Sequence, residues 1–170
     1  DMNEKRAEFR KALELDSGFY YAQYGIGGTY MIEGRLDEAI MALNRALDMK
    51  SDMVDAMVLL GTVYLDKGMP LQARDLLENA ASRDSSNPGI LLRLGQAYSQ
   101  LERYESAEKA FRRALTIAPE EPMIYYYLGL VSEMSGKKTE AVKNYQRFVE
   151  LAPDHKFVPS VKKTLERLNR

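Results

Sequence analysis

The stretch "LLRLGQAYSQ", residues 91–100, decides the fold, because it reads as a helix with a glycine, Gly95, in its middle. A glycine inside a helix costs roughly 0.8–1 kcal/mol relative to alanine. Glycine nevertheless recurs at one interval of 34 residues, at Gly27, Gly61, Gly95 and Gly129. A fixed period of this size indicates an array of repeated supersecondary units. The sequence therefore predicts a repeat protein.

Other positions keep the same interval of 34 residues. Alanine stands twelve residues after each glycine, an aliphatic residue stands immediately before it, and tyrosine stands three residues after the first three glycines. These residues are Ala39, Ala73, Ala107 and Ala141, then Ile26, Leu60, Leu94 and Leu128, then Tyr30, Tyr64 and Tyr98, with Ser132 in the fourth place. The four full repeats that follow from this alignment are residues 20–53, 54–87, 88–121 and 122–155.

Each repeat reads as two helices joined by a short turn. In the third repeat, Asn87 is a candidate N-cap and Pro88 suits the first position of a helix over 88–100. A second helix over 104–117 carries apolar residues at helical spacing. We expect Gly95 to lie where the two helices approach closely and to face a small alanine of the second helix. Packing would then offset the helix-propensity cost of the glycine.

This pattern resembles the tetratricopeptide repeat (TPR) family, and the resemblance covers nearly the whole chain. The family's signature slots in the third repeat hold Leu91, Leu94, Gly95, Tyr98, Ala107, Phe111, Ala114 and Pro119. The chain departs from the family at the early aromatic slot, which holds Gln23, Met57, Leu91 or Tyr125, and at the closing proline, replaced by Ser51 and Ser85. The resemblance implies an all-α fold, a right-handed α-solenoid of helix-turn-helix repeats.

The two ends of the chain extend this array. Residues 1–19 match only the second helix of a truncated repeat, and residues 156–170 read as a polar capping helix, which solenoids need for solubility. We therefore expect a single TPR array over residues 1–170. Because the N-terminal half-repeat lacks its first helix, we also expect that the chain was cut from a longer protein.

Composition and motifs argue against several functions. The net charge of −1 is unlike that of a general nucleic-acid binder, and no apolar run reaches the roughly 18–20 residues of a membrane span. There is no cysteine, and the one histidine, His155, lies in a turn with no pattern typical of a catalytic nucleophile. We expect a chain that is not an enzyme, has no cofactor or metal site, binds no nucleic acid and does not insert into a membrane.

The resemblance also implies a binding surface, because the first helices of TPR arrays line a concave groove. The matching positions are unusually apolar and aromatic in this chain, and aromatic residues and methionine are enriched in interface cores. We expect them to bind an apolar segment of a protein or peptide partner. These residues are Tyr21, Tyr24, Gly28, Met31, Val58, Leu59, Leu92, Arg93, Gln96, Met123, Tyr126, Tyr127 and Leu130.

The sequence bears on three other functions. Chaperone-binding TPR domains hold a peptide C-terminus with a carboxylate clamp, but only Arg93 matches that clamp here, so this partner class is disfavoured. Self-association through the open N-terminal half-repeat is an alternative function. A regulatory subunit of an enzyme complex is another, and no feature of the sequence tests it.

Two local features of the sequence have alternative interpretations. Gly25 and Gly28 either expose bare backbone to a ligand or pack against residues 2–15. Tyr126 and Tyr127 either line the groove or cover the capping helix.

Overall fold

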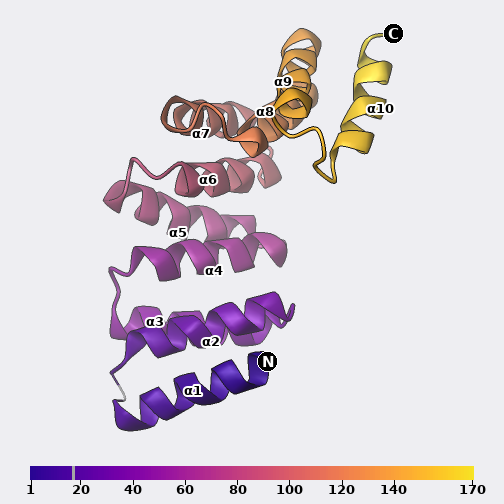
Figure 1. Ribbon diagram of the computed structural model, residues 1–170. Helices are drawn as coiled ribbons and strands as arrows, with labels where there is room; N and C mark the ends of the chain where they lie inside the picture. Colours follow the sequence, from indigo (N-terminus) through magenta and orange to yellow (C-terminus); the bar gives the residue numbers. More distant parts are fainter. Residues whose placement is uncertain (17) are drawn as a thin grey trace. The chain divides into compact units, whose positions relative to one another are not determined.

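The computed structural model describes residues 1–16 and 18–170, and this part of the chain contains ten α-helices and no strand. The chain forms two compact units, Asp1–Ser85 and Ser86–Arg170. Unit 1 contains α1 (Met2–Leu15), α2 (Tyr20–Ile32), α3 (Leu36–Met49), α4 (Val54–Asp66) and α5 (Pro70–Arg83). Unit 2 contains α6 (Pro88–Gln100), α7 (Tyr104–Ile117), α8 (Pro122–Met134), α9 (Lys138–Leu151) and α10 (Val158–Leu168). The helices are labelled in Figure 1.

Within unit 1, helices that follow one another in the chain pack as neighbours. Helix α2 packs on α3, α4 packs on α5, and α3 packs on α4, while α1 lies against α2. Helix α2 also contacts α4, so these first helices of two successive helix pairs are adjacent. The core between them is aliphatic, with Ala39, Leu43, Leu60 and Val63 almost completely buried.

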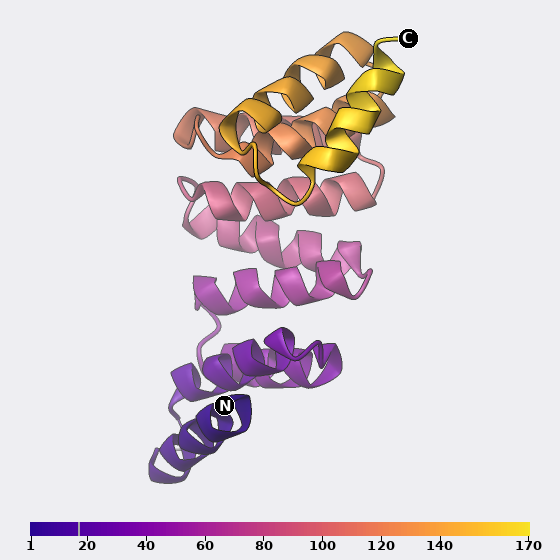
Figure 2. The same ribbon diagram turned by 45° about the vertical axis from the view of Figure 1, so that its right-hand side comes forward.

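Unit 2 repeats this arrangement and adds a last helix. Helix α6 packs on α7, α8 on α9 and α7 on α8, and α6 also contacts α8. Helix α10 lies against α9, and Figure 2 shows these two helices side by side. The core here contains buried aromatic rings, including Phe111, Tyr145 and Phe148.

Local sequence sets the ends of the helices. The side chain of Asn87 accepts hydrogen bonds from two backbone N–H groups in the first turn of α6, as an N-cap should. In the turn inside each helix pair, the left-handed backbone falls on Gly34 (φ 73°), Gly68 (φ 72°) and Gly136 (φ 73°). Glu102 (φ 59°) takes this position in the third turn, where a side chain is less favourable.

The repeat glycines face large side chains, so the expectation that Gly95 faces a small alanine is wrong. A Cβ atom added to Gly95 would lie 2.6 Å from Cδ1 of Phe111, and one added to Gly61 would lie 2.8 Å from Cγ of Leu77. The other two glycines do the same, Gly27 with Leu43 and Gly129 with Tyr145. The bare backbone forms a slot that a bulky residue of the second helix fills, and burial of that residue offsets the helix-propensity cost.

Candidate protein-binding site

Helices α2 and α4 give unit 1 an apolar surface, the first-helix face of unit 1. Its residues are Tyr21, Tyr24, Gly28 and Met31 on α2 and Val58 and Leu59 on α4. The four on α2 are three or four residues apart, so they share one side of that helix. Tyr21 is 50% exposed, and the other five are half-buried. The predicted residues of unit 1 are therefore partly exposed, and those on α2 share one side of that helix.

Tyr24 anchors this face through its ring. The ring packs against the buried Ala46 and Ala56 of the core. Burial raises the pKa of the Tyr24 hydroxyl, and the negative charge of Asp55 raises it further. The hydroxyl is therefore protonated at neutral pH and offers a hydrogen-bond donor beside an apolar surface.

The two glycines of α2 differ in their surroundings. A Cβ atom on Gly25 would lie 2.6 Å from Cε2 of Phe9, so the ring of Phe9 in α1 covers this backbone. A Cβ atom on Gly28 would have one neighbour, Cδ2 of Leu59, at 3.8 Å, which is an ordinary contact distance. Packing against residues 2–15 is thus the answer for Gly25, whereas the backbone at Gly28 is open.

We expect opposite stability changes when each of these glycines becomes alanine. Gly28→Ala should raise the free energy of unfolding by up to about 1 kcal/mol, because alanine favours the helix and meets no obstacle. Gly25→Ala should lower it by about 1 kcal/mol, because Phe9 must move away. Urea unfolding followed by circular dichroism measures both. Changes of the same sign would contradict the packing of Phe9 on Gly25.

The first-helix face of unit 2 is formed by α6 and α8. Its predicted residues are Leu92, Arg93 and Gln96 on α6 and Met123, Tyr126, Tyr127 and Leu130 on α8. Nη1 of Arg93 donates a hydrogen bond to Oε1 of Gln96 at 3.0 Å. Tyr127 stacks on Phe111 with their ring centroids 5.7 Å apart. The ring stacking and the hydrogen bond fix these side chains in place before any partner arrives.

The ring of Tyr126 packs against the C-terminal part of unit 2. Its ring stacks on Phe157 at 4.9 Å and lies 5.3 Å from the ring of Phe148. Burial raises the pKa of its hydroxyl, with Tyr127 as a second cause. Met123 and Leu130 pack against the same cluster. Covering the segment before α10 is thus the answer for Tyr126, and a Tyr126→Ala change alters that packing as well as the surface.

Three family models described as tetratricopeptide repeat match this sequence, at residues 6–56, 64–129 and 124–155. The chain belongs to the tetratricopeptide repeat family. TPR proteins bind protein or peptide partners and are typically non-catalytic, so this TPR chain is a protein–protein interaction scaffold. A search of curated proteins gave no match.

Solved TPR structures share the fold. A crystal structure of MamA is 24% identical, has a TM-score of 0.82 and covers 90% of each chain. A MamA fragment from Desulfovibrio magneticus RS-1 is 19% identical, has a TM-score of 0.84 and covers 91% of this chain and 88% of that one. YrrB, described as a TPR protein with an unusual peptide-binding site, is 23% identical to this chain and has a TM-score of 0.81. The match covers 95% of this chain and 84% of YrrB. The prediction of an all-α repeat solenoid is confirmed.

Sequence reasoning missed two hollows of this TPR chain. One, of about 380 Å³, lies between α1, α2 and α3, and Gln23 lines it. The departure of Gln23 from the family's aromatic slot was the available signal. The other, of about 570 Å³, lies at the turns of unit 2 beside Glu108 and Lys137. Nζ of Lys137 lies 2.7 Å from Oε2 of Glu108, and this hydrogen bond is the main cause that lowers the pKa of the Glu108 carboxyl.

Two further features bear on chemistry. In the described residues, no three His, Cys, Asp or Glu side chains gather closely enough to hold a metal ion. Nδ1 of His155 accepts a hydrogen bond from the backbone N–H of Phe157 at 3.2 Å, and its ring meets Phe148 edge-on. This histidine therefore has a packing role at the start of α10.

No described helix combines the length and the apolar character that crossing a membrane requires.

Proposed function

We propose that this TPR scaffold binds an apolar segment of a partner protein on the first-helix face of unit 1. The observation that carries the proposal is the open backbone of Gly28, whose added Cβ would have one neighbour at 3.8 Å. Met31 and Tyr24 flank it on the same side of α2. A partner's backbone or methyl group can approach this strip more closely than any position that carries a side chain.

The chemistry of this face favours an apolar partner. Exposed aromatic and methionine side chains bury large areas on binding, and tyrosine has few rotamers to immobilise. Tyr21 lies at one end of the strip, and Ile32, 66% exposed, lies just beyond the other. An amphipathic helix with apolar residues three or four apart, or an extended segment, fits such a strip. The peptide-binding site named for YrrB supports the same class of partner at the level of the fold.

We infer that the first-helix face of unit 2 adds polar recognition. The Arg93–Gln96 pair places a guanidinium on the same helix as the apolar Leu92. A charged group there makes the orientation of a bound partner specific, which apolar burial alone does not. We also keep the repeat boundaries 20–53, 54–87, 88–121 and 122–155, with a half-repeat before them and a cap after them, as our proposal for how the array is divided.

A peptide-display selection on the whole chain tests the proposal. Peptides enriched from a random library should be rich in aliphatic and aromatic residues. Gly28→Leu should weaken the best of these peptides at least about tenfold, because its side chain fills the open strip. The matched control is Leu71→Ala, which truncates a 52% exposed leucine on α5, away from this face. Isothermal titration of parent and variants measures the affinities.

The ionic strength supplies a second readout. Affinity should change little between low and high salt, since salt screens contacts between charges far more than apolar burial. Unchanged affinity in Gly28→Leu, or a steep loss of affinity with salt, would remove the site from this face. Thermal unfolding of Gly28→Leu checks that the variant is folded.

A further inference from the structure

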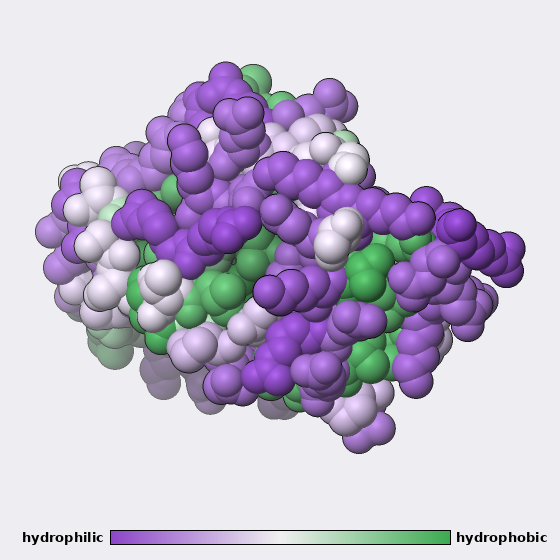
Figure 3. Space-filling view, turned by 90° about the horizontal axis from the view of Figure 1, so that it is seen from above, coloured by the Kyte–Doolittle hydropathy of each residue, from purple (hydrophilic) through white to green (hydrophobic). Residues whose placement is uncertain are grey.

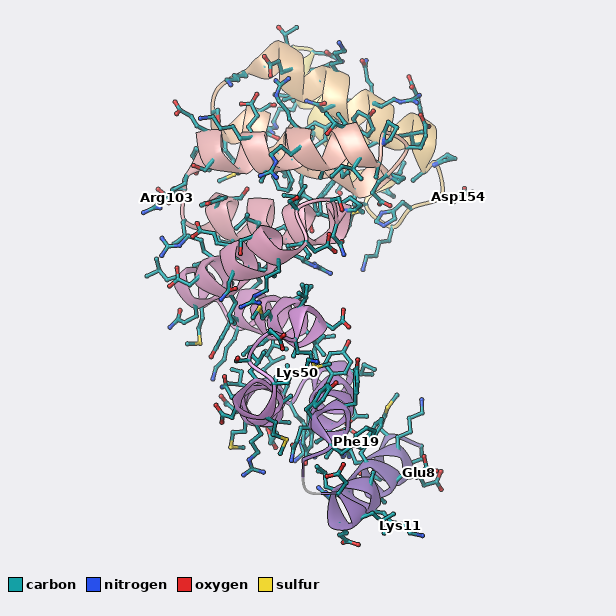
Figure 4. The ribbon with its side chains drawn as sticks, turned by 90° about the vertical axis from the view of Figure 1, so that its left-hand side faces the viewer. Glu8, Lys11, Phe19, Lys50, Arg103 and Asp154 are labelled. Atoms are coloured by element: carbon teal, nitrogen blue, oxygen red, sulfur yellow. The ribbon has the colours of Figure 1, made fainter. Side chains whose placement is uncertain are left out.

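The hollow of about 380 Å³ between α1, α2 and α3 lies on the other side of α2 from the first-helix face. Gln23, Ile26 and Tyr30 line it, and they are three or four residues apart on the side of α2 opposite Tyr24. Glu8 and Lys11 of α1 point to solvent (Figure 4). We call the hollow the outer pocket of unit 1. Its volume is within the range of small-ligand or side-chain sites.

A glutamine side chain that makes no hydrogen bond inside the described part of the chain lines the outer pocket. Gln23 is 9% exposed, and its side chain makes no hydrogen bond with any residue in 1–16 or 18–170. Its amide atoms are not among the buried polar atoms that lack a partner, so they are accessible from the pocket. The equivalent residues of the other repeats are Met57, Leu91 and Tyr125, and none of them carries an amide. Gln23 therefore offers a donor and an acceptor to a molecule that enters the pocket.

The equivalent positions of unit 2, three repeats further along the chain, show which ion pairs the arginines make there. Arg112 and Arg10 are equivalent positions 102 residues apart. Nη2 of Arg112 lies 2.6 Å from Oε1 of Glu108 and 3.4 Å from Oε2 of Glu140. Arg10 makes no ion pair with a carboxylate of the described residues. Its Nη2 donates a 3.3 Å hydrogen bond to the hydroxyl of Tyr30.

The second arginine that lines the outer pocket, Arg45, differs from its equivalent in unit 2 in the same way. Nη2 of Arg147 lies 3.3 Å from Oε2 of Glu120, and its Nη1 lies 3.1 Å from Oε2 of Glu150. Its equivalent, Arg45, lines the outer pocket of unit 1 and makes no ion pair or hydrogen bond with the described residues. The unit 1 equivalents of these two arginines, Arg10 and Arg45, thus make no ion pair with the described residues.

The sequence accounts for the missing carboxylates. Where unit 2 has Glu108, unit 1 has Arg6, and where unit 2 has Glu120, unit 1 has Gly18. The equivalent of Glu150 is the shorter Asp48, which makes no ion pair with Arg45. Glu38 is retained, but Arg35 binds it at 2.6 Å. Among the charged residues that line the pocket, those without an ion pair are then two arginines, Arg10 and Arg45, and one glutamate, Glu14.

We infer that the outer pocket of unit 1 binds a short acidic segment of a partner protein, with an aliphatic residue next to a carboxylate. The carboxylate lies between Arg10 and Arg45, in the role that internal glutamates have in unit 2. The aliphatic side chain contacts Ile26 and Met41, and the segment's backbone amide pairs with Gln23. A peptide rather than a nucleic acid is favoured because the walls are apolar, with Met41 itself 55% exposed. This site is separate from the first-helix face.

Methyl NMR of the whole chain, titrated with two peptides, tests this inference. The probe is an acetylated, amidated hexapeptide in which two leucines flank an aspartate–glutamate pair. The comparison peptide has asparagine and glutamine at those two positions. The acidic peptide should shift the methyl signals of Ile26 and Met41 and bind at least about tenfold more tightly than the neutral one. Its affinity should fall with added salt.

Variants assign the contacts. Arg45→Gln and Gln23→Met should each weaken the acidic peptide about tenfold. The matched control is Arg147→Gln, which changes the equivalent arginine of unit 2 and should leave the Ile26 and Met41 titration as it is. Met stands at the equivalent position 57, so Gln23→Met keeps a residue that this slot accommodates. Thermal unfolding of each variant verifies that it is folded.

Three results would overturn the inference. The first is equal affinity for the two peptides, and the second is unchanged affinity in Arg45→Gln. The third is a single-stranded oligonucleotide that shifts Ile26 and Met41 when the acidic peptide does not, which would assign the arginines to phosphate. None of these results bears on the first-helix face, since that site is tested by Gly28→Leu.

Discussion

Gly95→Leu is expected to lower the free energy of unfolding by about 3 kcal/mol, the upper end of the usual cost of overpacking a core. The reason is geometric: even a Cβ at position 95 would lie 2.6 Å from Cδ1 of Phe111. Phe111 is completely buried and is stacked on Tyr127, so its ring has no free space into which it can move. Urea unfolding monitored by circular dichroism gives the change.

The control for this experiment is Gly28→Leu, which adds the same side chain in the middle of another first helix. Because the nearest atom to an added Cβ there is 3.8 Å away, this variant should keep the parent's unfolding midpoint or exceed it. A second check pairs Gly95→Ala with Phe111→Ala, since removal of the ring vacates the space that a Cβ at position 95 needs. The double variant should lose less than the sum of the two single changes. Equal midpoints for Gly95→Leu and Gly28→Leu would refute the slot.

Tyr145→Ala is expected to cost about 3–5 kcal/mol, as large-to-small changes of buried aromatic residues do. Tyr145 is 2% exposed and fills the slot at Gly129. Its hydroxyl donates a hydrogen bond to Oε2 of Glu133 at 2.9 Å, and Glu133 also pairs with Arg167 of α10. Loss of the ring therefore opens a cavity between α8 and α9 and disturbs the residue that binds α10.

Tyr145→Phe separates the hydroxyl from the ring. Burial and the hydrogen bond to Glu133 raise the pKa of the Tyr145 hydroxyl well above its usual range, so it is a donor at any working pH. Its loss should cost roughly 1.5 kcal/mol, the low end for a hydrogen bond to a charged group. Hydrogen exchange should quicken in α10 before it quickens in α6. A Tyr145→Phe chain with parental stability and exchange would show that Glu133 does not need this donor.

Much of the fold was readable from the sequence, because the information is local. The spacing of apolar residues, the proline and Asn87 at the start of α6, and glycine in three of the four inner turns each act within one or two helical turns. A period of 34 residues then states that the same helix pair is built again. These features predicted the helix pairs of both units without knowledge of any contact between them.

The candidate binding site was predicted only as a set of positions. Helical spacing placed Tyr24, Gly28 and Met31 on one side of α2, which is correct for any helix. It did not tell which of the aromatic residues are already used inside the molecule. Tyr126 and Tyr127 have the same type and adjacent positions, yet one stacks on Phe157 and the other on Phe111.

What the sequence determined by itself is the repeat: its period, its two helices, the caps and turns, and the side of each helix that faces the core. Only the tertiary structure decided what meets across the gaps between helices. It put Phe111 rather than an alanine over Gly95, Phe9 over Gly25, and no bulky side chain over Gly28. It also brought α1, α2 and α3 together around Gln23 and left two arginines there without an ion pair to the described residues. The physical reason is that periodicity fixes directions along one helix, whereas the occupant of a slot depends on the length, shape and charge of side chains from other helices.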